Sequence, residues 1–199
     1  MTRVILFDLS ETIIAGLVGI EKPLALRLEM DALRILPAFG GELLCRLCRG
    51  ELSEDEYLVL VLEQQGWKIP AEELKQVIRR NFHTPVPGMW ELLSRLSARY
   101  DLALHSDHAR EWVEYIQAVH PGLAVFRRQF YSFKLGQLKS ETAVFQRVLA
   151  ALGCVASECL LVDDNPVNVA AAESAGIKGI RFTIADKLKE ELAEQGINI

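Results

Sequence analysis

The sequence contains no long hydrophobic run. Its first apolar stretch, Val4 to Phe7, ends at Asp8, and no later stretch approaches the roughly 20 apolar residues of a membrane span. The short run also lacks the pattern of a secretory signal. We therefore expect a cytoplasmic protein that does not act at a membrane.

Basic residues are too few and too scattered to form a strongly positive surface. The chain has 22 Lys and Arg residues against 27 Asp and Glu residues, for a net charge of -5. Nucleic-acid-binding proteins usually carry a concentrated basic patch, which attracts the phosphate backbone. The composition therefore argues against a nucleic-acid partner.

Cysteine is also scarce, with only Cys45, Cys48, Cys154 and Cys159. In a reducing compartment such residues are usually small buried side chains and not disulfide partners. Cys45 and Cys48 have the two-residue gap seen in zinc sites, but no second Cys or His pair of matching spacing follows. We expect this pair to pack in a helical apolar face.

The 199 residues are 50% hydrophobic and 25% charged, the balance of an ordinary globular protein with one sizeable core. Short apolar runs alternate with segments of helical period. That alternation predicts an α/β fold with a Rossmann-like, doubly wound parallel sheet and helices on both faces. The expected strands are Arg3–Phe7, Leu102–His105, Gln129–Phe133, Leu160–Val162 and Gly179–Phe182. The expected helices between and after them are Gly88–Tyr100, Arg110–Val119, Glu141–Leu152 with Ser140 as N-cap, Val167–Ala175 and Ala185–Glu194.

The segment between the first two strands is too long for one crossover. It shows its own helical patterns, at Pro23–Leu36, Ala38–Arg49, Ser53–Gln65 with a capping box at its start, and Ala71–Asn81. Gly and Pro residues mark both of its joints. We expect an α-helical cap domain over residues 15–84, inserted into a core domain of residues 1–14 and 85–199.

Polar residues follow the predicted strands at their carboxyl ends, where an open parallel sheet binds its ligands. These residues are Asp8, Ser10 and Thr12; Ser106, Asp107 and His108; Lys139; and Asp163, Asp164 and Asn165. The carboxylates are hard oxygen ligands suited to Mg²⁺, while Lys139 and Ser106 can hold an anion beside the metal. Asp8 could then attack phosphorus and form an aspartyl phosphate that water hydrolyses. The pattern indicates phosphoryl transfer from a small phosphorylated metabolite.

Four stretches carry a resemblance to a known family. They are "FDLSET" from Phe7 to Thr12, Ser106, Lys139, and "LVDDNPVNVAAAESAGI" from Leu161 to Ile177. Together they resemble the four motifs of the haloacid dehalogenase superfamily of hydrolases, subfamily I, whose members carry a helical cap after the first strand. The resemblance implies a magnesium-dependent hydrolase, most often a phosphatase. "FDLSETI" and "RGELSEDEY" further resemble the glucose-1-phosphate phosphatase branch, which suggests a sugar phosphate as substrate.

The resemblance also implies a role for each matching residue. Asp8 corresponds to the nucleophile, Leu9 would contribute a backbone amide, and the Ser10 carbonyl would be a metal ligand. Ser106, with Thr12 and Asp107 beside the same edge, would bind the substrate. Asp163 and Asp164 would complete the metal site with Asp8. Lys139 corresponds to the lysine that contacts both nucleophile and phosphate, and Lys134 is its rival.

Ser10 departs from the family pattern, because this position usually holds a second aspartate that acts as general acid and base. A serine hydroxyl does not titrate near neutral pH, and losing such a group typically costs about 10² to 10⁴ in rate. Three interpretations stay open: a phosphatase that obtains its proton elsewhere, a pseudoenzyme that binds a phosphorylated ligand or a partner, and a 2-haloacid dehalogenase. His108 is a candidate substitute proton donor, although a structural role is the commoner use of such a histidine.

Overall fold

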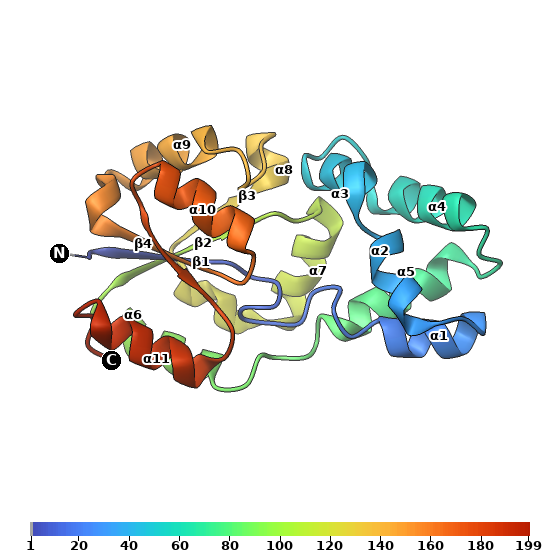
Figure 1. Ribbon diagram of the computed structural model, residues 1–199, viewed down its shortest axis with the longest axis horizontal. Helices are drawn as coiled ribbons and strands as arrows, with labels where there is room; N and C mark the ends of the chain where they lie inside the picture. Colours follow the sequence, from blue (N-terminus) through green and yellow to red (C-terminus); the bar gives the residue numbers. More distant parts are fainter. Residues whose placement is uncertain (1) are drawn as a thin grey trace.

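A five-stranded parallel sheet with the strand order β3-β2-β1-β4-β5 forms the centre of the larger lobe (Figure 1). The computed structural model describes residues 2–199. The strands are β1 (Val4–Phe7), β2 (Asp101–Ser106), β3 (Arg128–Tyr131), β4 (Cys159–Asp163) and β5 (Lys178–Arg181). This confirms the predicted doubly wound α/β fold.

Eleven α-helices occur in the described part of the chain. They are α1 (Glu21–Leu28), α2 (Ile35–Ala38), α3 (Gly41–Cys48), α4 (Glu54–Gln65), α5 (Ala71–Asn81), α6 (Met89–Ser97), α7 (Arg110–Val119), α8 (Ser132–Leu135), α9 (Ala143–Leu152), α10 (Pro166–Ser174) and α11 (Ala185–Glu194). Three short 3₁₀ helices lie at Ala32–Arg34, Pro121–Val125 and Ala156–Glu158.

The central strands β1, β2 and β4 are buried on both faces, which explains why they are nearly continuous apolar runs, while the edge strands β3 and β5 carry exposed residues. Along β1, Ile5 and Phe7 face the cluster formed with α6, α7 and α11, while Val4 and Leu6 face the cluster formed with α9 and α10. Figure 1 shows α9 and α10 above the sheet and α6 and α11 below it. The alternation follows from the two-residue period of a strand.

The strand register brings the candidate site together. Phe7 pairs with Val162 of β4 and with Leu104 of β2, so the residues after these three strands emerge side by side. The chain runs from β1 outward to β3 and then crosses back to β4. The strand order therefore reverses next to β1, and such a switch point is where open α/β sheets bind ligands.

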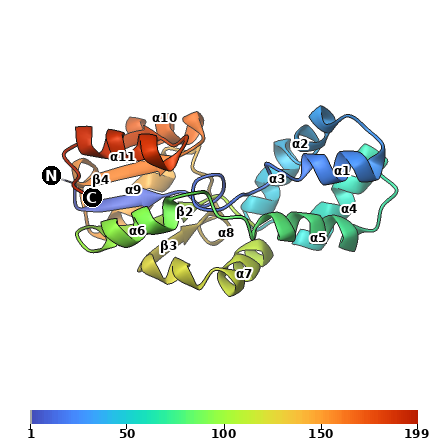
Figure 2. The same cartoon turned by 90° about the horizontal axis from the view of Figure 1, so that it is seen from below.

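Helices α1 to α5 form a second lobe beside the carboxyl edge of the sheet (Figures 1 and 2). Two linkers join the lobes and pair with each other, because Ala15 N donates to Thr84 O at 2.8 Å and Val86 N donates to Ile13 O at 2.9 Å. The predicted capping box at the start of α4 is present, with Ser53 as N-cap and Glu56 as its partner. No helix within residues 2–199 is long and apolar enough to cross a membrane.

A buried glutamate ties the two lobes together. Glu54 on α4 is 1% exposed and accepts a hydrogen bond from Trp112 Nε1 of α7 at 2.9 Å. Arg79 Nη2 of α5 lies 2.6 Å from the same carboxylate and supplies its counter-charge. A buried carboxylate is stable only with such partners, so this cluster favours close approach of the small lobe.

Two expected helices differ from the structure. The expected helix Pro23–Leu36 is wrong, since α1 ends at Leu28, its C-cap Glu29 adopts the left-handed region (φ 53°), and the Asp31 side chain accepts from Leu33 N, starting a separate 3₁₀ turn. Ser140 is not a helix cap, because α9 begins at Ala143 with Thr142 as its N-cap. The residues before α9 are instead held in a turn in which Leu138 N donates to Glu141 Oε1 at 3.1 Å.

Candidate active site

Three charged side chains meet where β1 and β4 end. The ammonium group of Lys139 lies 2.5 Å from Asp8 Oδ1 and 2.6 Å from Asp163 Oδ2. Asp8 directly follows β1, Asp163 is the last residue of β4, and Lys139 reaches them from the turn before α9. All three are buried. Lys134, the rival lysine, is exposed and lies over the rings of Tyr131 and Phe133.

Burial and the neighbouring charges have opposite effects on the pKa values of Lys139 and Asp8. Burial alone would lower the pKa of Lys139, but the carboxylates of Asp163 and Asp8 outweigh it and raise that pKa, so the amine stays protonated. Burial raises the pKa of Asp8 to about 8, because the attraction of Lys139 offsets it only in part. Keeping Asp8 ionised at neutral pH therefore requires more positive charge than Lys139 supplies.

Asp164 adds a third carboxylate to the cluster. Carboxylate oxygens of Asp8, Asp163 and Asp164 all lie within 4.8 Å of one another. Burial, together with the nearby charge of Asp163, raises the pKa of Asp164. Closely spaced hard oxygen donors that resist ionising without a cation fit a divalent ion such as Mg²⁺. These side chains, with the Ser10 carbonyl, are the ones that could hold it.

Asn168 orients Asp163 and was not assigned a site role from the sequence. Its Nδ2 donates to both carboxylate oxygens of Asp163, at 3.1 and 3.3 Å, while Asn165 N donates to Asp163 Oδ1 at 2.9 Å. Asn168 lies on the first turns of α10 and is buried. Its spacing in the "DDNPVN" stretch was the signal that could have identified it.

Ser10 is hydrogen-bonded to a histidine that comes from another strand end. Ser10 Oγ lies 3.1 Å from His108 Nε2, and the imidazole tautomer decides which of the two atoms donates. The His108 ring sits among Phe82 and Trp112, with centroids 5.8 and 5.6 Å away. Burial lowers the pKa of His108 to about 3, so the imidazole is neutral at physiological pH.

The turn after β1 holds Ser10 against the linker to the small lobe. Glu11 adopts a left-handed backbone conformation (φ 58°), and its Oε1 accepts from Gly16 N at 2.8 Å and Val18 N at 3.0 Å. A Cβ atom at Gly16 would lie 2.7 Å from the Ser10 Cβ. Gly16 therefore permits a close approach that no other residue allows without movement.

The remaining predicted substrate-binding residues occupy different environments. Asp107 lines the pocket described below, and its carboxylate accepts from Lys139 N at 3.1 Å. Ser106 and Thr12 are fully buried with no hydrogen-bond partner for their hydroxyls among the described residues, and neither lines the pocket. Leu9 is buried in the core, so only its backbone could contribute to binding.

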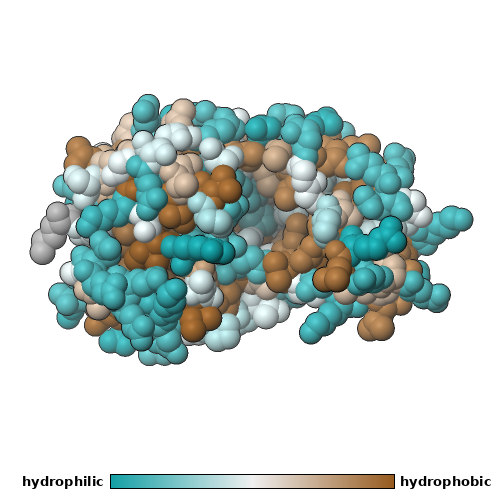
Figure 3. All heavy atoms as spheres, viewed as in Figure 1, coloured by the Kyte–Doolittle hydropathy of each residue, from teal (hydrophilic) through white to brown (hydrophobic). Residues whose placement is uncertain are grey.

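A pocket of about 470 Å³ opens above the carboxylates between the two lobes. The surface is visibly hollowed at this place (Figure 3). The sheet edge supplies its polar floor, including Asp8, Ser10, Asp107 and Lys139. Cys45 and Cys48 on α3 also line it, so this pair faces the site as well as the helical core; their spacing gave no indication of that.

This geometry agrees with the family that the sequence matches over residues 2–176, described as haloacid dehalogenase-like hydrolases. The chain belongs to this family. Among curated members, it is 27% identical to flavin mononucleotide hydrolase 1 of the Arabidopsis thaliana chloroplast, over 98% of this chain and 78% of that protein.

Two solved structures of haloacid dehalogenase-like proteins illustrate the shared fold. A predicted hydrolase of the family from Porphyromonas gingivalis is 20% identical, with a TM-score of 0.78 and full coverage of both chains. A family enzyme from Bacteroides thetaiotaomicron, in complex with magnesium and inorganic phosphate, is 17% identical, with a TM-score of 0.71 over 93% of this chain and 96% of that chain. At these identities, the likeness establishes the fold alone.

Proposed function

We propose that this haloacid dehalogenase-like hydrolase is a magnesium-dependent phosphatase that acts on a small phosphorylated metabolite through an aspartyl phosphate. One observation carries the proposal: the buried Lys139 ammonium lies between the carboxylates of Asp8 and Asp163 at the switch point of the sheet. A nucleophilic carboxylate must approach a phosphate that is itself negative, and a fixed cation beside it reduces that repulsion.

The chain's own residues can perform two successive displacements. An Asp8 carboxylate oxygen attacks phosphorus, the ester P–O bond breaks, and the leaving alkoxide takes a proton from a solvent water, which leaves hydroxide. A second water then attacks phosphorus of the acyl phosphate and gives its proton to that hydroxide, which releases inorganic phosphate and restores the Asp8 carboxylate. Lys139 remains protonated throughout and neutralises charge on the transferring group. A magnesium ion held by Asp8, Asp163 and Asp164 would supply additional charge stabilisation.

The proton for the departing alcohol is the unusual part of this proposal. Ser10 stands where the family usually has a carboxylic acid, and its hydroxyl cannot release a proton near neutral pH. The group beside it is the neutral imidazole of His108, 3.1 Å away. We assign the Ser10–His108 pair to the site that faces the leaving group, with slower turnover than a carboxylic acid would give.

The relatives support a phosphate ester as substrate. The Arabidopsis thaliana relative is named for hydrolysis of flavin mononucleotide, which is a phosphate monoester. The Bacteroides thetaiotaomicron structure holds magnesium and inorganic phosphate. The choice between sugar phosphates and other monoesters depends on the pocket wall. The expected cytoplasmic location and the absence of a nucleic-acid partner remain predictions from the sequence.

Phosphate release from a panel of monoesters tests the proposal. The panel contains p-nitrophenyl phosphate, flavin mononucleotide and glucose 1-phosphate, each assayed with magnesium and with a chelator. We expect magnesium-dependent release that Asp8→Asn abolishes. Lys134→Met is the matched surface control for Lys139→Met, and only the latter should reduce release.

Two results would contradict the proposal. Equal residual rates in the wild type and Asp8→Asn would show that Asp8 is not the nucleophile, leaving a binding protein without turnover. Halide release from a 2-haloacid without phosphate release from any monoester would establish the dehalogenase alternative.

A further inference from the structure

The wall of the pocket opposite the carboxylates is apolar. It is formed by Leu17, Leu44, Cys45, Cys48, Phe82 and Trp112. Helix α3 contributes three of these side chains, the linkers to the small lobe contribute Leu17 and Phe82, and α7 contributes Trp112. The polar lining residues come instead from the strand ends, the adjoining turns and the start of α10. The pocket therefore has a charged floor and an apolar side.

The aromatic part of this wall is preformed. The rings of Phe82 and Trp112 meet edge to face with centroids 5.6 Å apart, and both residues are buried. Trp112 Nε1 already donates to Glu54, so the indole offers the pocket only its apolar surface. A wall that is fixed before binding loses little conformational entropy when a ligand arrives.

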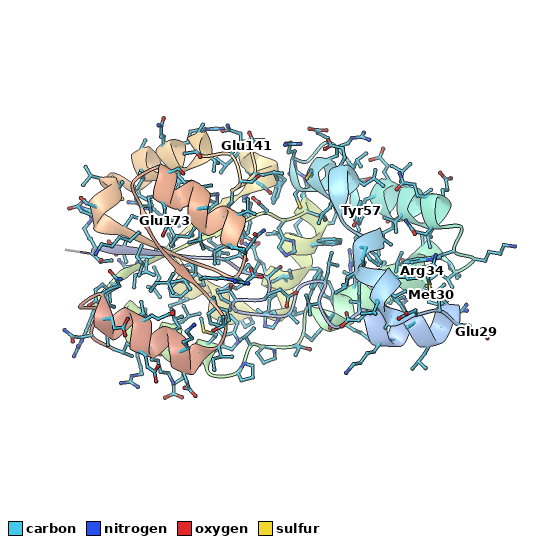
Figure 4. All side chains as sticks on the ribbon, viewed as in Figure 1. Glu29, Met30, Arg34, Tyr57, Glu141 and Glu173 are labelled. Carbon is cyan, nitrogen blue, oxygen red and sulfur yellow. The ribbon has the colours of Figure 1, made fainter. Side chains whose placement is uncertain are left out.

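The small lobe brings no charge to the pocket. Its arginines Arg27, Arg46 and Arg49 do not line the pocket. Arg27 is paired with Glu73, Arg46 with Glu51, and Arg49 with Glu141. Figure 4 shows Glu141 on the sheet lobe. Lys139 is the one Lys or Arg among the described lining residues, and Asp8 and Asp163 already engage it.

This arrangement of apolar and charged side chains favours some phosphate esters over others as substrates. Hexose hydroxyl groups placed against the apolar wall would face side chains that cannot bond them, and an unpaired buried hydroxyl weakens binding about tenfold or more. A second phosphate or a carboxylate would find no free cation. An uncharged flat ring would displace water from the wall and contact chiefly its half-buried members Leu17, Leu44 and Cys45, since Phe82 and Trp112 are 0% and 3% exposed.

We infer that the substrate carries a single phosphate on an uncharged leaving group with a flat apolar face, an aromatic ring or fused heterocycle, which the wall of α3, Phe82 and Trp112 holds. The inference rests on the proposed phosphatase activity and narrows its substrate away from the hexose phosphates suggested by the sequence. We expect the leaving group of the substrate, and not a separate ligand, to lie against the wall, because the wall and the carboxylates line the same pocket.

Two measurements test the inference separately from catalysis. First, kcat/KM for 1-naphthyl phosphate is compared with that for glucose 6-phosphate, and we expect a ratio of at least about 10². Second, calorimetry with a chelator present measures binding of 1-naphthol alone, which needs neither metal nor phosphate chemistry. Leu44→Asn should weaken naphthol binding and lower the kcat/KM ratio by about tenfold each.

Matched controls separate the wall from general effects of substitution. Leu26→Asn makes the same change at an 82% exposed position of the small lobe. Cys45→Ser adds a hydroxyl to the wall, while Cys154→Ser makes that change at another half-buried cysteine outside the pocket. Leu26→Asn and Cys154→Ser should retain both the affinity for 1-naphthol and the ratio of kcat/KM for 1-naphthyl phosphate to that for glucose 6-phosphate. Cys45→Ser should reduce both quantities.

The outcomes distinguish the two proposals. Efficient phosphate release with hexose phosphates as good as naphthyl phosphate would overturn the inference and leave the phosphatase standing. Naphthol binding that Leu44→Asn weakens, without phosphate release from any ester, would support the apolar ligand wall and refute the phosphatase. Thermal melts of Leu44→Asn and Cys45→Ser verify that each variant is folded. If Leu44→Asn does not fold, Cys45→Ser still tests the contribution of the wall.

Discussion

Lys139→Met removes the one cation that the structure places between two buried carboxylates. Lys139 is 1% exposed, and Asp8 and Asp163 are 5% and 0% exposed, so solvent cannot replace the lost charge. Removing one partner of a buried ion pair typically costs 3–5 kcal/mol, and protonation of Asp8 can recover part of that. We expect the free energy of unfolding to fall by about 3 kcal/mol at neutral pH without magnesium.

The loss of stability caused by Lys139→Met depends on pH. Burial already raises the pKa of Asp8 to about 8, and removal of the neighbouring cation should raise it further. A carboxyl group whose folded-state pKa is raised stabilises the fold at low pH, and that stability is lost as pH rises through the folded-state pKa. Up to about pH 8 this loss runs in parallel in the two proteins, so the deficit of the variant against the wild type should grow only above about pH 8, where Asp8 is ionised in the wild type and still protonated in the variant.

Thermal unfolding in chelator and in millimolar magnesium measures both effects. For a chain of this length, 3 kcal/mol corresponds to a fall in Tm of about 6–12 °C. Magnesium should recover more stability in Lys139→Met than in the wild type, because the carboxylates then lack their resident cation. Lys134→Met is the control and should change Tm by less than about 2 °C. A Lys139→Met variant as stable as the wild type in chelator would refute the reasoning.

Three further substitutions test other parts of the site. Asn168→Ala removes the donor that orients both oxygens of Asp163 and should weaken magnesium affinity about 10- to 100-fold by calorimetry; unchanged affinity would exclude the positioning role. His108→Gln should lower turnover about tenfold while sparing phosphate binding, and unchanged turnover would remove the histidine beside Ser10 from the reaction. His105→Leu should raise the free energy of unfolding by about 1 kcal/mol, because both ring nitrogens of this buried histidine lack a partner among the described residues. Burial also lowers the pKa of His105, which costs stability as pH falls below about 6.5, so urea titrations should show a shallower acid loss in His105→Leu.

Apolar runs predicted the strands to within about two residues, and most closely the three central strands β1, β2 and β4, which are buried almost throughout, whereas the edge strands β3 and β5 carry exposed charged residues. The third strand was the least accurate: it ends at Tyr131, where α8 begins, and not at Phe133. Helix ends depended on local hydrogen bonds that spacing does not reveal. Asp31 interrupts the expected helix of the small lobe, and the turn that contains Lys139 delays α9 beyond Ser140.

The fold class, the edge of the sheet that carries the chemistry, and the aspartates and lysine expected there could all be predicted from the sequence. These predictions were possible because buried parallel strands must be apolar and because their carboxyl ends share one edge. The tertiary structure was needed to show that His108 meets Ser10 and that Cys45 and Leu44 face the pocket. These contacts join residues far apart in the chain, or depend on how one lobe rests against the other. Such contacts depend on tertiary packing, which the hydrophobic periodicity of the sequence does not reveal.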